Sequence, residues 1–147
     1  AEIKRKSPSA GMIAENASAL DQARIYQNAG ADAIWVSNHG GRQLDGSPPA
    51  LLALPKIRES VAPNLPIIFD SGVRSGEDIL KALALGANFI MLGRPIMMAL
   101  AASSEKGLTD YISMLKEEIK VVMAQLGLKD LSKISGDVLY DDISTKM

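Results

Sequence analysis

Residues 66–93 read PIIFDSGVRSGEDILKALALGANFIMLG and contain one complete strand–helix–strand unit. The apolar run 66–69 predicts a buried strand that ends at Asp70. Ser75 predicts the start of a helix over 75–85, because Asp78 completes a capping box in which Asp replaces the usual Glu or Gln. Gly86 ends this helix, and a second apolar strand is expected over 88–92. Such a unit is typical of a parallel sheet.

The same alternation extends in both directions along the chain. Upstream we expect a short strand over 1–5, a helix over 18–29, a strand over 31–36 and a helix over 50–61 that Pro55 kinks or divides. Downstream we expect helices over 95–102 and 108–126, the second with a clear amphipathic repeat. The sequence therefore predicts an α/β fold of four βα units, which is half of a (β/α)8 TIM barrel. Either the half is completed by a partner, as a homodimer or with a complementary half-barrel, or the sheet stays open.

Composition excludes several functions. The 147 residues carry a net charge of −1, are 47% hydrophobic and contain no cysteine. This balance gives no support to nucleic-acid binding, and no apolar stretch is long enough for a membrane span. The lack of cysteine excludes disulfides, thiolate metal sites and cysteine nucleophiles, and no metal site is predicted. The first residues have no signal-peptide core and no initiator methionine, so we expect a cytoplasmic chain that is a fragment, a processed product or an engineered protein.

The most informative candidate site follows the expected strand 31–36. His39 is the only histidine of the chain, and Arg42 comes three residues later. An imidazole exchanges protons near neutral pH, and a guanidinium pairs with a carboxylate through two parallel hydrogen bonds. Gly40 and Gly41 allow the backbone to come close to a ligand. This loop predicts a site that removes a proton from a substrate bearing a carboxylate.

Glycine–arginine pairs follow the next two strands. Gly72 and Arg74 come after the strand 66–69, and Gly93 and Arg94 come after the strand 88–92. In barrels the loops after the last strands commonly bind phosphate, which glycine amides approach and arginines neutralise. Each pair alone is also compatible with an ordinary surface arginine or turn. Lys4, at the end of the first expected strand, is equally compatible with a solvated basic patch.

Three segments together resemble a known family. Residues 37–45 (SNHGGRQLD), 70–74 (DSGVR) and 84–95, which contain ALGA and LGRP, are similar to the C-terminal half of FMN-dependent α-hydroxy-acid oxidases and dehydrogenases. The resemblance implies that His39 accepts the proton of a 2-hydroxy-acid substrate and that Arg42 binds its carboxylate. It also implies an FMN site, with Ser37 near the flavin ring and the ribityl and phosphate groups held by Asp70, Gly72, Arg74, Gly93 and Arg94.

The N-terminal segment is similar to a different family. Residues 1–11 (AEIKRKSPSAG) resemble the first strand and loop of indole-3-glycerol-phosphate synthase, in which Glu2 and Lys4 would match positions of the catalytic site. Lys4 could alternatively stand in for the lysine that contacts the flavin ring in the oxidase family. The chain is thus interpreted as a chimera of a synthase-like βα unit over 1–30 and an oxidase-like half-barrel over 31–134, followed by a polar tail over 135–147.

These observations predict FMN-dependent oxidation of a 2-hydroxy acid to a 2-oxo acid. The alternative is a recombined or designed half-barrel scaffold without turnover that retains at most a phosphate or FMN site. The oxidase family's N-terminal half supplies further flavin and substrate contacts that have no counterpart here. A synthase activity is the third interpretation, and it rests on the eleven N-terminal residues alone.

Overall fold

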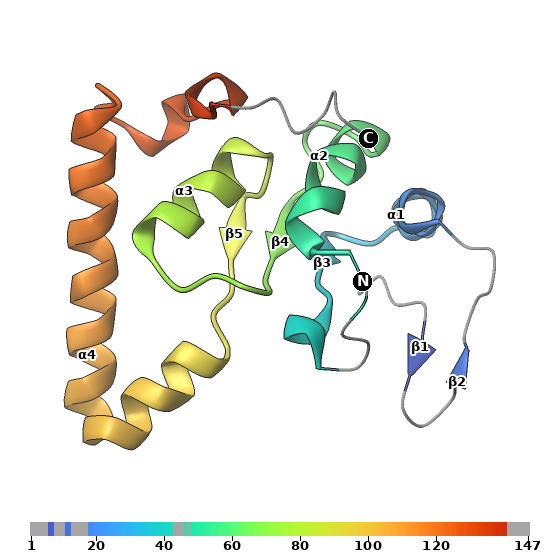
Figure 1. The fold of residues 1–147 in the computed structure, drawn as a ribbon. Helices are drawn as coiled ribbons and strands as arrows, with labels where there is room; N and C mark the ends of the chain where they lie inside the picture. Colours follow the sequence, from blue (N-terminus) through green and yellow to red (C-terminus); the bar gives the residue numbers. More distant parts are fainter. Residues whose placement is uncertain (1–5, 8–10, 13–17, 43–45, 47, 141–147) are drawn as a thin grey trace.

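A small parallel sheet forms the centre of the protein (Figure 1). The computed structural model describes residues 6–7, 11–12, 18–42, 46 and 48–140. The sheet has the order β3-β4-β5, from the strands β3 (Ile34–Val36), β4 (Ile67–Phe69) and β5 (Phe89–Ile90). All pairings are parallel, with Val36 opposite Phe69 and Phe69 opposite Ile90. The carboxyl ends of the three strands therefore meet at one edge.

The helices lie where the sequence predicts them. They are α1 (Ala19–Asn28), α2 (Ala50–Ser60), α3 (Gly76–Ala84) and α4 (Arg94–Gln125). The capping box of α3 is confirmed: Ser75 accepts a hydrogen bond from the Asp78 amide, and the Asp78 carboxylate accepts one from the Ser75 amide. Pro55 lies inside α2 without dividing it.

Helix α4 consists of two helical segments joined at a sharp bend (Figure 1). Ser103 and Ser104 have non-helical backbone angles, with φ of −157° and 48°. The bend confirms the prediction of separate helices over 95–102 and 108–126. Two 3₁₀ turns follow, Leu131–Lys133 and Gly136–Val138.

One face of the sheet forms the hydrophobic core. The side chains of Ile34, Val36, Ile67 and Phe69 are at most 3% exposed. They pack with the buried side chains of helix α2, among them Leu54 and Ile57.

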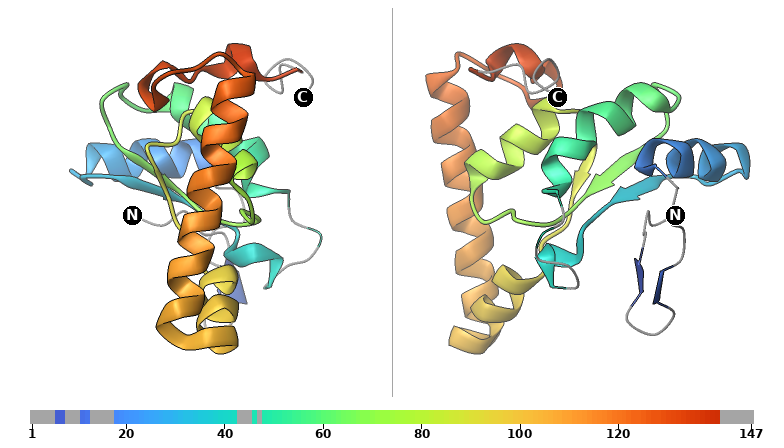
Figure 2. Two further views of the ribbon diagram at one scale, coloured as in Figure 1. Left: turned by 90° about the vertical axis from the view of Figure 1, so that its left-hand side faces the viewer. Right: turned by 45° about the vertical axis from the view of Figure 1, so that its right-hand side comes forward.

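The other face of the sheet is more open. Trp35, Ile68 and Phe89 are neighbours in the strand register, and the Phe89 side chain is 62% exposed. In a closed barrel this face would line the interior. The turned views in Figure 2 show the helices gathered to one side of the strands, as in a sector of a barrel.

The N-terminal segment forms a hairpin beside this sheet. Strands β1 (Lys6–Ser7) and β2 (Gly11–Met12) pair antiparallel with each other and lie apart from β3 (Figure 1). The strand predicted over 1–5 and Lys4 fall outside the described residues, so the first of the four predicted units remains a prediction. The described part thus has the half-barrel α/β architecture with three parallel strands. Within it, no helix combines the length and apolar character needed to cross a membrane.

Candidate functional site

A cavity of about 280 Å³ lies at the carboxyl ends of the three strands. It brings together all the predicted site residues except Lys4, which lies outside the described residues. From the loop after β3 come Ser37, His39 and Arg42; from the loop after β4 come Asp70, Gly72 and Arg74; and from the end of β5 come Gly93 and Arg94. The two most distant residues of its lining, Trp35 and Arg94, are 59 positions apart in sequence.

The loop that carries His39 makes an unusually tight turn. His39, Gly40 and Gly41 all have positive φ values, of 57°, 66° and 75°. The turn is closed by the Asn38 side-chain oxygen, which accepts a hydrogen bond from the Gly41 amide at 3.2 Å. Glycine adopts this conformation without strain, whereas a histidine does so less readily. The His39 and Arg42 side chains, carried on this turn, are both exposed.

The Asp70 carboxylate is the centre of a hydrogen-bond network beneath the loop. Its Oδ2 accepts a bond from the Trp35 indole N–H at 3.1 Å. Its Oδ1 accepts bonds from the hydroxyl groups of Ser37 and Ser71, each at 2.6 Å. An ionised carboxylate strengthens hydrogen bonds that it accepts. Asp70 therefore holds one side chain from β3 and two from the strand ends in fixed positions.

The two serine hydroxyls extend this network to the backbone of the histidine loop. The Ser71 oxygen accepts from the amides of Asn38 (3.1 Å) and Gly40 (3.2 Å). The Ser37 oxygen accepts from the amide of His39 at 3.1 Å. Three consecutive amides of the loop are thus bonded to hydroxyls that both donate to Asp70.

Arginines give the cavity a positive lining. The side chains of Arg42, Arg74 and Arg94 are exposed at its surface. Arg94 donates to the Gly40 carbonyl oxygen at 3.0 Å, and Arg74 donates to the carbonyl of Val73 at 2.8 Å. These bonds leave further N–H groups on each guanidinium, which has five. The lining suits an anion.

Two glycines leave space for a ligand beside these arginines. Gly72 has a φ of 86°, and a Cβ placed on Gly72 or Gly93 would have no neighbour within 4 Å. Helix α4 begins at Arg94, directly after Gly93; Pro95 has no amide N–H and the amides of Ile96 and Met97 donate to the Gly93 carbonyl, so the Arg94 amide is the donor that this helix N-terminus offers. Open backbone, a helix N-terminus and guanidinium groups are the donor set that phosphate requires. The described residues therefore fit the phosphate end of FMN.

Side chains of α3 and α4 form hydrogen bonds to the backbone of the loop after β4. The Asp78 carboxylate accepts from the Arg74 amide at 2.9 Å, and the Tyr111 hydroxyl donates to the Arg74 carbonyl at 2.9 Å. Burial raises the pKa of Tyr111, nearby Arg74 lowers it, and the carboxylates of Glu118 and Asp78 raise it, for a net upward shift. The neutral phenol that donates this bond is thus the favoured form.

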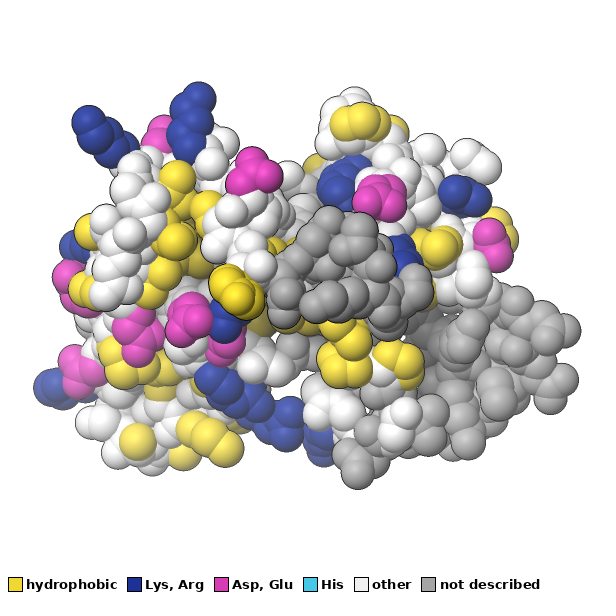
Figure 3. Space-filling view, turned by 45° about the horizontal axis from the view of Figure 1, so that its top comes forward, with side chains coloured by type: hydrophobic (Ala, Val, Ile, Leu, Met, Phe, Trp, Pro, Cys, Tyr) yellow, Lys and Arg dark blue, Asp and Glu magenta, His cyan; other side chains and the backbone are white. Residues whose placement is uncertain are grey.

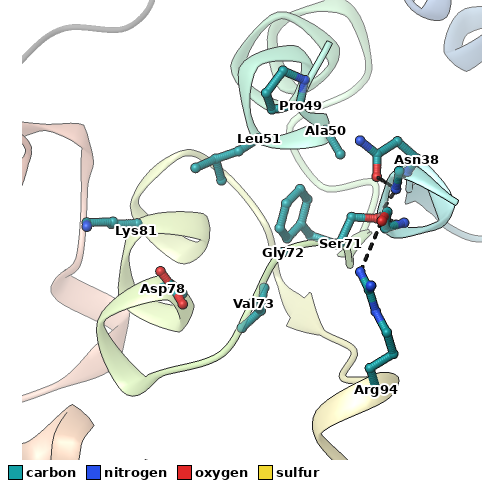
Figure 4. Close-up of a pocket in the computed structure, with 13 residues that line it drawn as sticks. Asn38, Pro49, Ala50, Leu51, Ser71, Gly72, Val73, Asp78, Lys81 and Arg94 are labelled. Atoms are coloured by element: carbon teal, nitrogen blue, oxygen red, sulfur yellow. Dashed lines mark hydrogen bonds between the residues drawn. The ribbon is translucent and has the colours of Figure 1, made fainter. Parts of the chain in front are cut away.

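A second cavity, of about 390 Å³, is drawn in Figure 4 and shares part of its lining with the first. Its distinct residues include the apolar Leu51 and Phe69 and the charged Asp78 and Lys81. Lys81 forms an ion pair with Glu77 at 2.7 Å. The two cavities share the strip made of Gly40, Ser71, Gly72, Val73 and Arg94. Because His39 and Arg42 line only the first cavity, that cavity is the candidate site for chemistry.

Four residues that line the cavity have no function predicted from the sequence: Trp35, Ser71, Val73 and Met91. The sequence predicts Trp35 only as part of a strand. Because side chains alternate between the two faces of a strand and its neighbours Ile34 and Val36 are apolar and buried, the pattern indicates that Trp35 lies on the opposite face of the sheet. Ser71 follows Asp70 directly and has a φ of 84°. Nothing in the sequence alone indicates this conformation.

The fold and the site define a class: a parallel βα protein with an anion site and a histidine at the strand ends. The family model described as FMN-dependent dehydrogenase matches residues 17–141. The chain belongs to this family.

Individual relatives agree with the family. An L-lactate oxidase from Alicycliphilus denitrificans is 47% identical over 119 residues, which are 81% of this chain and 33% of that protein. The crystal structure of a mandelate oxidase with benzoyl-formic acid is 42% identical, with a TM-score of 0.73 over 77% of this chain and 34% of that one. A structure described as a putative lactate oxidase from Pediococcus acidilactici is 43% identical, with a TM-score of 0.76 over 80% of this chain and 33% of that one. This chain therefore spans about a third of the length of these relatives.

Proposed function

We propose that this chain carries the FMN-phosphate site and the proton-transfer site of an enzyme that oxidises a 2-hydroxy acid to a 2-oxo acid. The observation that carries the proposal is the single cavity lined by His39, Arg42, Arg74 and Arg94. The lactate and mandelate oxidases among its relatives support the same substrate class.

The proposed roles follow from the chemistry of each group. Arg42 pairs with the substrate carboxylate through its planar guanidinium and so orients the substrate. His39, exposed on the same turn, accepts the proton from the substrate's hydroxyl or α-carbon. FMN, when bound, supplies the acceptor for the two electrons that the substrate loses.

The remaining predicted residues hold the cofactor in this proposal. Arg74 and Arg94 neutralise the phosphate, and Gly72 and Gly93 let it reach backbone amides. Asp70 already accepts three hydrogen bonds, and the second lone pair of its Oδ2 can accept one more from a ribityl hydroxyl. Ser37 is proposed to lie near the flavin ring, as the family resemblance implies, and Lys4 is the candidate for the lysine that contacts the ring in that family.

The chain's only tryptophan makes cofactor binding directly measurable. Trp35 lines the cavity, so bound FMN should quench its fluorescence. We expect saturable quenching by FMN, weakened at least about 10-fold in Arg74→Ala, which removes a charge-assisted contact. Arg24→Ala, on α1 and outside the cavity lining, is the matched control and should bind as the parent does. Absence of any quenching at millimolar FMN would refute the cofactor site.

Turnover is tested separately. With FMN present, we expect oxidation of lactate, glycolate or mandelate that is lost in His39→Ala while FMN quenching persists. Oxidation retained at the parent rate in His39→Ala would refute the role of the histidine as base.

A scaffold without turnover is the second candidate, and the open sheet face favours it. Phe89 is 62% exposed on this face, although parallel sheets are usually covered on both sides.

We propose that a second copy of the chain, or a complementary half-barrel, covers this open face of the sheet. Hydrophobic side chains also remain exposed along α4: Met97, Met98, Ile112, Met114 and Val121. On the left of the space-filling view, hydrophobic side chains lie among charged side chains of both signs (Figure 3). A monomeric mass in sedimentation at micromolar concentration would refute the homodimer, and FMN binding without oxidation would support the scaffold.

We also propose that the chain is a chimera with a synthase-like N-terminal unit. The family match begins only at residue 17, and the hairpin of β1 and β2 lies before that point and beside the sheet (Figure 1). Residues 1–11 are the part that resembles indole-3-glycerol-phosphate synthase. Deleting residues 1–16 should leave FMN quenching unchanged if the cofactor site belongs wholly to the oxidase-like unit. A loss of FMN affinity would instead assign Lys4 or its neighbours to the cofactor site.

A further inference from the structure

We infer that Ser71 is a positioning residue that sets the conformation of the histidine loop and couples it to the phosphate-binding loop. The inference rests on the proposed function, because it concerns the placement of His39. Ser71 belongs to the loop after β4, which also carries Gly72 and Arg74. Its hydroxyl reaches across to the loop after β3.

Every hydrogen-bonding position of the Ser71 hydroxyl is occupied. It donates to Asp70 Oδ1 at 2.6 Å and accepts from the amides of Asn38 and Gly40 at 3.1 and 3.2 Å. A hydroxyl has one donor and two acceptor positions, so all three are occupied. The Gly40 amide belongs to the peptide unit that follows His39, and the Asn38 amide belongs to the unit that joins Ser37 to Asn38, so Ser71 holds the loop before and after the histidine.

The backbone of Ser71 gives an independent reason to assign it a role. Its φ of 84° lies in the left-handed region, which favours glycine. A Gly at this position would relieve the strain but would leave the two amides of the histidine loop without the hydroxyl. A strained residue that persists is held by its surroundings, and here the surroundings are the Asp70 network.

The position of Ser71 also links the proposed phosphate site to the loop that carries His39. The next residue, Gly72, lines the open space beside Arg74, and Arg94 on the other side donates to the carbonyl of Gly40. The histidine loop is therefore held from the loops after both β4 and β5, which are the loops proposed to bind phosphate (Figure 4). We expect phosphate binding to reduce motion of the turn that carries His39.

The test compares Ser71→Gly and Ser71→Ala with the parent chain by amide hydrogen exchange, measured residue by residue by NMR. Ser71→Gly is compatible with the positive φ and so keeps the fold. Loss of one neutral hydrogen bond predicts that the Asn38 and Gly40 amides exchange about 5- to 10-fold faster. The amides of β3 and β4 should be unchanged. Ser60→Ala is the matched control: it removes a hydroxyl that donates to the Ile57 carbonyl at the end of α2, and it should leave the histidine loop unaffected.

Coupling is measured by repeating the exchange with inorganic phosphate. In the parent chain phosphate should slow exchange at residues 38–40, and in Ser71→Gly this slowing should be reduced at least about 3-fold. Unchanged exchange of Asn38 and Gly40 in folded Ser71→Gly would overturn the inference. These measurements need neither FMN nor turnover, so they decide the role of Ser71 even if no oxidation is found. Where oxidation is found, Ser71→Gly should lower kcat more than it raises KM, because Arg42 still binds the carboxylate.

Discussion

The contact between α3 and α4 at Gly76 supports a quantitative prediction for Gly76→Ala. A Cβ on Gly76 would lie 2.7 Å from the Ile119 amide nitrogen, 2.7 Å from the Glu118 Cβ and 2.9 Å from the Leu115 carbonyl oxygen. Two of these neighbours are backbone atoms of α4, which move only if the helix moves. The Glu118 carboxylate also accepts a 2.6 Å hydrogen bond from the Gly76 amide, and this bond would lengthen as the helices separate.

The expected cost combines these effects. Overpacking of this kind costs about 1–3 kcal/mol, and loss of a hydrogen bond to a charged group costs about 1.5–3 kcal/mol. The better helix propensity of alanine offsets at most about 1 kcal/mol. We therefore expect Gly76→Ala to lower the free energy of unfolding by about 2–5 kcal/mol, or the Tm by about 5–15 °C.

Urea unfolding followed by circular dichroism measures this change. The control is Gly136→Ala, where the nearest atom, the Ala84 carbonyl oxygen, is 3.9 Å from the added Cβ. That variant should differ from the parent by less than about 0.5 kcal/mol. A urea midpoint for Gly76→Ala equal to that of Gly136→Ala would refute the close packing of α3 on α4.

Three further predictions concern the site and its support. The pKa of Tyr111 is raised in the folded chain, so its neutral phenol stabilises the fold fully below pH 10.0, the ordinary pKa of tyrosine, and this contribution is lost as the pH rises through the folded pKa. In unfolding measurements at alkaline pH, Tyr111→Phe should not show this loss of stability. An identical pH dependence of stability in both proteins would contradict the prediction. Phe69→Ala should destabilise the fold by about 3–5 kcal/mol in urea unfolding, because Phe69 is 1% exposed; a change below about 1 kcal/mol would mean that the core relaxes around the gap. Asp70→Ala removes the acceptor of the Trp35 indole N–H and should shift the tryptophan emission maximum, with an unshifted spectrum arguing against the network.

The regular part of this fold could be predicted from sequence because its signals are local. Ser18 and Ser75 begin α1 and α3, and each accepts the hydrogen bond expected of an N-cap. The parallel strands follow from short apolar runs between helices, although the strands are shorter than the runs suggest. Pro55 does not divide α2, which continues from Ala50 to Ser60 although a proline inside a helix removes one amide donor, so only the kink remains a prediction.

The candidate site was predictable to a lesser extent. Parallel strands carry the residues after each strand to one edge, so the shared cavity of His39, Asp70 and Arg94 followed from topology. The network that joins Asp70 to Ser37 and Ser71 did not, because it depends on a positive φ and on contacts between residues more than 30 positions apart. Backbone conformation at such a residue is set by the tertiary structure rather than by its neighbours in sequence.

The strand order has a consequence for how this chain acquires its structure. Each strand of the sheet pairs only with the strand nearest to it along the chain, in the order β3-β4-β5. Ile34 pairs with Ile67 and Ile68 pairs with Phe89, so each pairing closes only one helix-containing crossover, and no pairing has to wait for a more distant part of the sheet. Each βα unit can thus dock onto the preceding one as it emerges during synthesis. A segment organised in this way can also be joined to, or exchanged with, another such segment at a helix–strand boundary without disturbing the pairings already made.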